Sequence, residues 1–291
     1  MVDLFKNLLR ESMLKASPGL LFRLQHYKLH KQFGTHSYWA NLNAPQTFNE
    51  HILRRKLDPA FRRLGEIYVD KFRVKKFVND RIGDEFLIPT LAVYDSTNSV
   101  WSSHFRQPCV IKPTHLSGEV IFLPDGYEQL DNERSRTVRR WFRTNHFSRT
   151  GEPQYRNLPP RVIVEPIIGD GKQPPPDYKI FCWAGQPRLI QVDANRFQGH
   201  QRCFFDLDWQ PLEMTLRYPP CTELPARPER LVEMLVIAQI LSTGFDFVRV
   251  DLYCTAGRIY FGELTFHPDS GNAPFNDYAT DLEMGRYFKA L

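Results

Sequence analysis

The chain has 291 residues, of which 42% are hydrophobic and 24% charged, an ordinary composition for a folded protein that is longer than a typical single domain. It has no apolar run near the ~18 residues that a membrane-spanning helix needs, and its first residues lack the features of a secretory signal peptide. The net charge of +5 and the pI near 8.9 permit an anionic partner without requiring one.

The cysteines show neither CxxC spacing nor any regular interval, and their number is odd. This pattern predicts buried free thiols in a reducing compartment, not a disulfide framework or a zinc site. A cytoplasmic location is therefore expected. The five positions are Cys109, Cys182, Cys203, Cys221 and Cys254.

Residues 1–31 combine six Lys or Arg with two acidic residues and many leucines. The favoured interpretation is a pair of helices, broken at Ser17-Pro-Gly19, that pack on the main body. The alternative is a basic amphipathic surface for peripheral association with a membrane. Further along, Thr47 and Glu50 have capping-box spacing before a helix that ends near Leu57. A second helix is predicted from about Arg62 to Arg81.

From Phe86 the pattern changes to short strands, with the basic stretch 134–149 read as a helix between them and residues 169–176 as a Gly/Pro-rich connector. A helix near 229–242 precedes the last pair of strands. The predicted strands are 91–94, 109–112, 120–123, 162–165, 178–183 and 188–193, followed by the pair 247–251 and 258–266, with residues 254–257 as a turn-like segment between them.

The last two strands are expected to form a hairpin that carries the chemistry. Arg249 and Asp251 are two residues apart and so share a face, as do Glu263 and Thr265 on the next strand. Two carboxylates suit Mg²⁺, and Arg249 could neutralise a phosphoryl group; a solvated surface ion pair is the alternative. Each one-residue slip in the pairing moves a side chain to the other face, so the two carboxylates share a face in a regular hairpin only if its loop has an odd number of residues. We therefore predict 256–258 as the loop, with Asp251 opposite Glu263, residue 253 opposite 261 and residue 255 opposite 259.

A lysine at the end of a strand, Lys112, precedes a loop that contains Ser117 and Gly118. An ammonium group beside loop N–H groups can clamp phosphate, although a solvated lysine is the commoner outcome and no P-loop motif is present. Three further residues have weaker individual signals. Glu165 and Asp177, at strand ends, could accept hydrogen bonds from an adenine amino group or a ribose hydroxyl. Lys71 could reach the same phosphates as Lys112.

In their order, these motifs resemble the ATP-grasp family, and most closely its TupA-like branch, named for teichuronic acid synthesis. The resemblance runs from about residue 41 to residue 285. It is carried by Thr47-Phe-Asn-Glu50, Val69-Asp-Lys-Phe72, Ile82-Gly-Asp-Glu85, Ile88-Pro89, Ile111-Lys112, Asp177-Tyr-Lys-Ile-Phe181, Phe247-Val-Arg-Val-Asp251 and Tyr260-Phe-Gly-Glu-Leu-Thr-Phe266.

The resemblance implies an α+β ATP-grasp fold in which two α+β lobes clasp ATP behind a helical N-terminal segment. The implied divisions are 1–70 for the helical segment, 71–166 for the small lobe with the phosphate loop, and 167–291 for the large lobe with the metal-binding hairpin. Mg²⁺ would be held by Asp251, Glu263 and Thr265. Arg249 and Lys112 would be catalytic, and the nucleotide would be bound by Lys71, Lys112, Ser117, Gly118, Glu165, Asp177 and Lys179.

The implied reaction is ATP-dependent ligation of a carboxylate to an amine through an acyl phosphate, with a free or sugar-linked uronic acid as the expected acid in surface polysaccharide synthesis, such as capsule or O-antigen. By position, substrate recognition is expected from His267, Asp269 and Ser270 after the hairpin, helped by Arg196 or Arg202. The family usually has Asn where this chain has Thr265, and its phosphate loop is richer in glycine than the segment ending at Glu119.

Two other functions remain open on the sequence. A phosphotransferase could use the same nucleotide site with a hydroxyl acceptor. A non-catalytic protein could bind a nucleotide or a polyanion through the basic stretches, but no RNA- or DNA-binding signature is present, so no nucleic-acid partner is expected.

Overall fold

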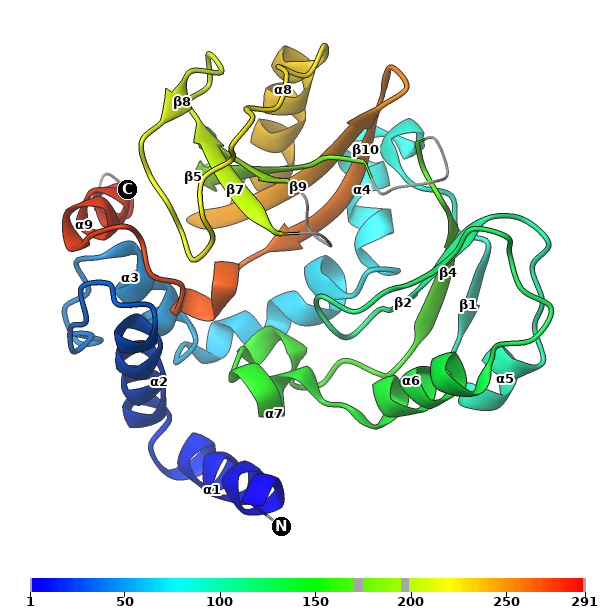
Figure 1. The fold of residues 1–291 in the computed structure, drawn as a ribbon, viewed down its shortest axis with the longest axis horizontal. Coiled ribbons are helices and arrows are strands. Elements are labelled where there is room, and N and C mark those ends of the chain that lie inside the picture. Colours follow the sequence, from blue (N-terminus) through cyan, green and yellow to red (C-terminus); the bar gives the residue numbers. More distant parts are fainter. Residues whose placement is uncertain (1, 170–174, 195–198, 290–291) are drawn as a thin grey trace.

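The computed structural model describes residues 2–169, 175–194 and 199–289, and Figure 1 shows two sheets with helices around them. Six strands form the larger sheet, in the order β10-β9-β5-β6-β7-β8, and four form the smaller one, in the order β1-β4-β2-β3. The strands are β1 (Ala92–Tyr94), β2 (Cys109–Pro113), β3 (Ile121–Leu123), β4 (Val162–Pro166), β5 (Asp177–Trp183), β6 (Gln186–Ala194), β7 (Gln201–Phe205), β8 (Pro211–Leu212), β9 (Phe247–Thr255) and β10 (Arg258–Thr265).

The helices lie at the N-terminal end and around both sheets (Figure 1). None of those in the described part of the chain combines the length and apolarity of a membrane span. The α-helices are α1 (Val2–Ala16), α2 (Pro18–Gln32), α3 (Phe48–Arg55), α4 (Val74–Ile82), α5 (Thr97–Trp101), α6 (Asn132–Arg143), α7 (His146–Thr150), α8 (Leu231–Ser242) and α9 (Tyr278–Arg286). The shorter helical segments are η1 (Pro59–Leu64), η2 (Gly65–Val69), η3 (Asp84–Phe86), η4 (Pro153–Tyr155) and η5 (Pro268–Gly271).

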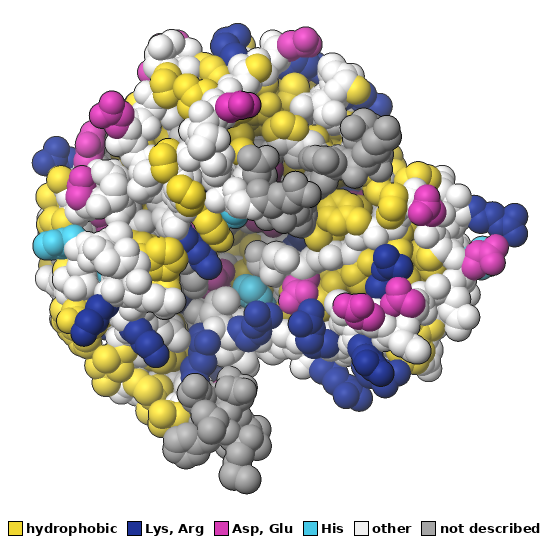
Figure 2. All heavy atoms as spheres, in the orientation of Figure 1, with side chains coloured by type: hydrophobic (Ala, Val, Ile, Leu, Met, Phe, Trp, Pro, Cys, Tyr) yellow, Lys and Arg dark blue, Asp and Glu magenta, His cyan; other side chains and the backbone are white. Residues whose placement is uncertain are grey.

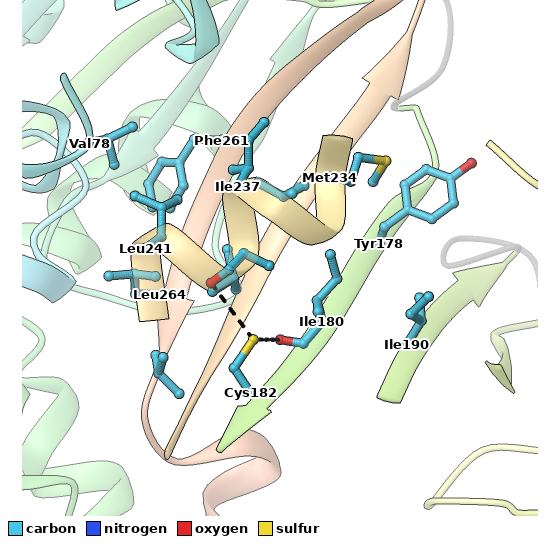
Figure 3. Close-up of a cluster of buried hydrophobic side chains, with 14 of the residues drawn as sticks. Val78, Tyr178, Ile180, Cys182, Ile190, Met234, Ile237, Leu241, Phe261 and Leu264 are labelled. Atoms are coloured by element: carbon cyan, nitrogen blue, oxygen red, sulfur yellow. Dashed lines mark hydrogen bonds between the residues drawn. The ribbon is translucent and has the colours of Figure 1, made fainter. Parts of the chain in front are cut away.

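The two faces of the larger sheet have different environments because side chains alternate along each strand. One face is apolar and packs against α4 and α8, as Figure 3 shows with Ile180 on β5, Ile237 on α8 and Leu264 on β10. At one end of the opposite face, Phe181, Trp183 and Phe247 pack under α3 and α9. The rest of that face carries mainly polar and charged side chains. The larger sheet therefore has a polar region that lies beside this aromatic cluster, on the face opposite α4 and α8.

The N-terminal predictions are confirmed. Two helices, α1 and α2, meet at Ser17 with Pro18 in the first turn of α2, as the break in the sequence indicates. Thr47 and Glu50 form the predicted reciprocal capping box at the start of α3. The strands predicted between residues 91 and 193 are also found, with small shifts of their ends, and β7 and β8 are additional.

The single helix predicted from Arg62 to Arg81 is wrong. The segment is divided into η1, η2 and α4, and the break falls at Asp70, whose backbone is extended. The Asp70 carboxylate accepts hydrogen bonds from the backbone N–H groups of Phe72 and Arg73, both at 3.0 Å, and from the Thr114 hydroxyl at 2.9 Å. An aspartate that binds nearby backbone donors in this way competes with helix formation.

The basic stretch 134–149 is likewise not one helix. α6 ends at Arg143, Thr144 is extended, and Asn145 caps the separate helix α7 by accepting from the Ser148 N–H at 3.3 Å. This break turns α7 back toward the N-terminal helices (Figure 1).

The prediction that all five cysteines are free thiols is wrong for two of them. Cys203 on β7 and Cys221 are joined by a disulfide, with their Cα atoms 5.5 Å apart. The Arg202 N–H donates to the Pro219 carbonyl oxygen at 2.9 Å, which brings the two segments side by side. The cysteine count therefore does not support a reducing compartment. Cys109, Cys182 and Cys254 are free.

The β9–β10 hairpin confirms the predicted pairing of Asp251 with Glu263 but not the predicted loop. Thr255 pairs with Arg258, so the loop has two residues, and the register shifts by one at Gly262. A two-residue loop alone would place the two carboxylates on opposite faces of the sheet. The extra residue of the bulge reverses this, so both carboxylates lie on one face. A Cβ at Gly262 would stand 3.0 Å from the Asp251 carbonyl oxygen, so any other residue there would crowd the backbone of β9.

We expect the replacement Ala256→Asn to raise the free energy of unfolding. Ala256 and Gly257 both have positive φ, 50° and 69°, and an ordinary L-residue in that conformation costs about 1–2 kcal/mol. Asparagine tolerates it, as the preference for Asn-Gly in such turns reflects. Thermal denaturation should show a higher melting temperature for Ala256→Asn and a lower one for Gly257→Ala than for the wild type. Equal melting temperatures would contradict this account of the turn.

Candidate functional site

A row of charged side chains crosses the polar face of the larger sheet. Lys179 on β5 is opposite Asp251 on β9 and Gln191 on β6, while Asp251 is opposite Glu263 on β10. Further along, Asp193 on β6 is opposite Arg202 on β7. The strand pairing therefore brings together residues that are far apart in the sequence.

Asp251 is the centre of this row and is only 2% exposed. Its carboxylate accepts two hydrogen bonds from Arg249, both at 2.7 Å, and one from Lys179 at 2.8 Å. Lys179 also contacts the carboxylate of Asp177. Burial opposes the charge on Arg249, but Asp251 and Glu263 outweigh it and raise the pKa of the guanidinium. The predicted Arg249–Asp251 cluster is therefore a charged and partly compensated network.

Glu263 and Thr265 extend the network to the edge strand. The Thr265 hydroxyl donates to Oε1 of Glu263 at 3.0 Å and accepts from Arg249 at 3.1 Å. Burial alone would raise the pKa of Glu263, but Lys71, Lys179 and Arg249 lower it to about 2. The side chain of Glu263 is 35% exposed, so this carboxylate stays charged and accessible.

The donor set of the hairpin fits Mg²⁺. Asp251 and Glu263 are hard oxygen ligands in register on one face, and Mg²⁺ is usually held by one or two carboxylates together with phosphate oxygens and water. A carboxylate has about four lone-pair positions. The hydrogen bonds that Arg249 and Lys179 donate to Asp251 occupy three of them, so within the described part of the chain one position on Oδ1 remains. Among the residues described, no group of three His, Cys, Asp or Glu side chains forms a metal site.

The smaller sheet supplies lysines. Lys112 on β2 and Lys75 on α4 both bind the Glu165 carboxylate of β4, at 2.8 and 2.5 Å. Burial favours the neutral form of Glu165, yet the two lysines together lower its pKa. The carboxylate predicted to face adenine or ribose is therefore a shared partner of two lysines, and its role toward a nucleotide stays a prediction. The sequence did not indicate Lys75 as a site residue; it only lies four residues after Lys71.

The loop between β2 and β3 is held at both of its ends. Thr114 is bound to Asp70 at one end, and at the other Glu119 accepts from Arg140 and Trp141 of α6 at 2.8 and 3.0 Å. Ser117 and Gly118 lie between these anchors, and Gly118 has positive φ with open space around it. Glu119 is thus an anchor for the loop, with its charge paired on α6.

Lys71 joins the two sheets electrostatically. Its backbone N–H donates to the Thr114 carbonyl oxygen at 3.2 Å, and its ammonium contacts the Leu116 carbonyl oxygen. Burial lowers the pKa of Lys71, and Glu263 on the larger sheet is the strongest opposing influence. The break at Asp70 therefore places this lysine between the β2–β3 loop and the carboxylates of the hairpin.

Tyr155, on η4, is a site residue that the sequence did not indicate. Its side chain is hydrogen-bonded to Ser117, and burial followed by the charges of Glu152 and Glu263 raises the pKa of the phenol well above its usual value. It belongs to no motif and follows no periodic pattern, so only the packing of η4 beside the phosphate loop reveals it.

The residues predicted to bind substrate fall into different places. His267 is 2% exposed and packs edge-on against Phe61, which favours a structural role. Arg202 is also buried, between Asp193 at 2.7 Å and Asp269 at 3.0 Å. Ser270 lines an open pocket, and Arg196 lies outside the described residues. Of this set, Ser270 is best placed to meet a ligand.

A comparison with solved structures finds several ligases. D-alanine–D-alanine ligase from Helicobacter pylori has 15% identity and a TM-score of 0.42, covering 77% of this chain and 59% of that one. The same ligase from Bacillus anthracis has 15% identity and a TM-score of 0.40, covering 77% and 69%.

The ATP-grasp ligase PsnB, complexed with a phosphomimetic precursor variant, Mg and ADP, has 11% identity and a TM-score of 0.35. The match covers 68% of this chain and 49% of PsnB, so the chain spans about half the length of that structure.

No curated protein matches significantly. The model of the TupA-like ATP-grasp family matches residues 50–289, which include both sheets and the hairpin. The chain therefore belongs to the TupA-like ATP-grasp family.

Proposed function

We propose that this protein is an ATP-dependent ligase that joins a carboxylate to an amine through an acyl phosphate. The observation that carries the proposal is the pairing of Asp251 with Glu263 on a face that also holds Arg249 and lies within electrostatic reach of Lys71. Carboxylates for a divalent cation and basic groups for phosphates are the parts that phosphoryl transfer needs. Membership in the ATP-grasp family supports ATP as the nucleotide.

In this proposal Lys71, Lys112 and the Ser117–Gly118 segment hold the phosphates of ATP. Asp251, Glu263 and the Thr265 hydroxyl hold Mg²⁺, which when bound neutralises charge between the phosphates. Arg249 is fixed by the two hydrogen bonds that it donates to Asp251, so its positive charge is oriented before the reaction begins. A charge that is already oriented stabilises a transferring phosphoryl group without further reorganisation.

The finer assignment is a uronic-acid sugar as the carboxylate and an amino acid or other amine as its partner, in the cytoplasmic synthesis of a surface polysaccharide. The branch to which the chain belongs supports this substrate class, since it takes its name from teichuronic acid synthesis. The sugar carboxylate would accept the γ-phosphoryl group, and the amine would then displace phosphate.

The test is a substrate panel with purified protein, ATP and Mg²⁺. We expect release of ADP and inorganic phosphate only when a uronic acid, such as glucuronic acid, and an amine are both present, with mass spectrometry showing an amide. Turnover with the acid alone, with phosphate retained on the acceptor, would identify a phosphotransferase instead. Nucleotide binding without turnover across the whole panel would contradict an enzymatic function.

A further inference from the structure

A basic pocket lies between the N-terminal helices, α7 and η5, and none of its lining residues belongs to the row of charges on the sheet. Its volume is about 330 Å³, within the range of small-molecule sites. Three cationic side chains line it, Arg10 from α1, Lys28 from α2 and Arg149 from α7, and no carboxylate is among its described lining residues. Figure 2 shows Lys and Arg side chains gathered along the lower edge of the molecule, where Figure 1 has α7 and α6.

The cations of this pocket are poorly compensated by the protein. The Nε of Arg10 is buried and has no hydrogen-bond partner within the described residues. Burial and then the neighbouring charge of Arg149 lower the pKa of Arg10, which means that two like charges face each other. Arg149 is 3.7 Å from Glu119, but that carboxylate is already paired with Arg140 at 2.8 Å. Cations held together in this way are stabilised by an anionic ligand.

Neutral polar side chains complete the lining. Ser270 belongs to η5 and Asn272 follows it directly, and within η5 Asp269 and Ser270 have positive φ of 46° and 59°. Two consecutive non-glycine residues in that conformation are strained, and such strain is concentrated at functional sites. The turn directs its two side chains to different partners, because Asp269 contacts Arg202 of the sheet while Ser270 lines the pocket.

The pocket adjoins the proposed catalytic site through buried polar groups. The Ser270 hydroxyl accepts from Lys56 at 3.0 Å and is hydrogen-bonded to the side chain of Glu152. Glu152 in turn is influenced by the charge of Glu263. Since η5 directly follows β10, it connects this pocket with the strand that carries Glu263, and a ligand whose charged end lies among Arg10, Lys28 and Arg149 could extend along it.

We propose that this pocket binds a phosphate or diphosphate group on the sugar substrate, and so places the sugar carboxylate toward Glu263. Three cations with no lining carboxylate match a ligand with two or more negative charges better than a single carboxylate. The assignment of this anion to the acceptor rests on the proposed ligase function; the presence of an anion site does not.

The experiment measures binding of inorganic pyrophosphate by calorimetry to the full-length protein and three variants. We expect Arg10→Gln with Lys28→Gln to weaken binding by at least about tenfold, as the loss of charged hydrogen bonds predicts. The control Lys15→Gln with Lys31→Gln removes the same charge from the exposed part of the same helices and should bind as the wild type does. Lys112→Ala should lose at most the pyrophosphate bound at the proposed nucleotide site and keep the binding that the pocket variant loses, because Lys112 is not part of the pocket.

Equal binding by the pocket and control variants, or loss of binding in Lys112→Ala alone, would overturn the site. Binding of ATP by the pocket variant, measured separately, tests the proposed nucleotide site independently of this result. Sedimentation with vesicles of phosphatidylglycerol and phosphatidylcholine distinguishes the source of the phosphate. Vesicle binding lost in the pocket variant would assign a lipid-borne phosphate, and its absence beside pyrophosphate binding would assign a soluble phosphorylated sugar; both results support the site.

Discussion

Asp251→Asn is expected to lower ATP turnover by a factor of about 100 or more, the size of effect that follows from losing one oriented charge-stabilising contact. An amide keeps the shape of the carboxylate but halves its acceptor oxygens and removes its charge. It would be a poorer ligand for Mg²⁺ and could not hold Arg249 by two bonds and Lys179 by a third. We also expect the free energy of unfolding to fall by about 3 kcal/mol, since two buried cations lose their partner.

Glu263→Gln separates the catalytic effect from the structural one. Glu263 is 35% exposed on its side chain, so the neutral amide should lower the melting temperature less than Asp251→Asn does. Turnover should still fall sharply, and the Mg²⁺ concentration for half-maximal activity should rise. Glu283→Gln on the exposed surface of α9 is the matched control and should change neither quantity. An unchanged Mg²⁺ titration in both Asp251→Asn and Glu263→Gln would identify a structural ion network.

The alternation of residue types was sufficient to predict most of the larger sheet. Along β9, Val248 and Val250 belong to the apolar core, while Arg249 and Asp251 point to the opposite face, and this pattern can be read directly from the sequence. Parity then predicted that Asp251 is opposite Glu263. It could not predict the form of the hairpin. A three-residue loop and a two-residue loop with a bulge at Gly262 both place Asp251 and Glu263 on the same face.

The errors have a common physical origin, which is contact between distant segments. A helical pattern across residues 62–81 is interrupted because Asp70 binds Thr114, 44 residues away. The disulfide joins Cys203 to Cys221 because the segment after β8 returns beside β7. Neither contact leaves a local signal, since propensity and periodicity describe only neighbours in the chain.

The candidate site was predictable in its residue types and less so in their partners. Spacing and motif order indicated Lys112, Asp251 and Glu263. They did not indicate that Lys75 shares Glu165 with Lys112, or that Tyr155 lies against Ser117. Such partnerships depend on the approach of α4 and η4 to the smaller sheet, which only the assembled structure defines.

Lys112→Ala is expected to abolish turnover while the protein stays folded. The Lys112 ammonium, at the end of β2, is the charge proposed to bind phosphate, and alanine cannot replace it. The structure adds a reason for the fold to survive. Glu165, the buried partner of Lys112, keeps a second ion pair with Lys75 at 2.5 Å, so its charge remains compensated.

Lys75→Ala is the matched comparison, because it removes the other lysine from the same carboxylate. Lys75 also donates to the Ile88 carbonyl oxygen at 2.7 Å and to Thr90 at 2.8 Å, contacts that join α4 to the segment before β1. We therefore expect Lys75→Ala to lower the melting temperature more than Lys112→Ala does, and to retain substantial turnover. Steady-state kinetics and thermal denaturation of both variants measure the two quantities. If both variants lose activity in proportion to stability, Lys112 only supports Glu165 and the phosphate must be bound elsewhere.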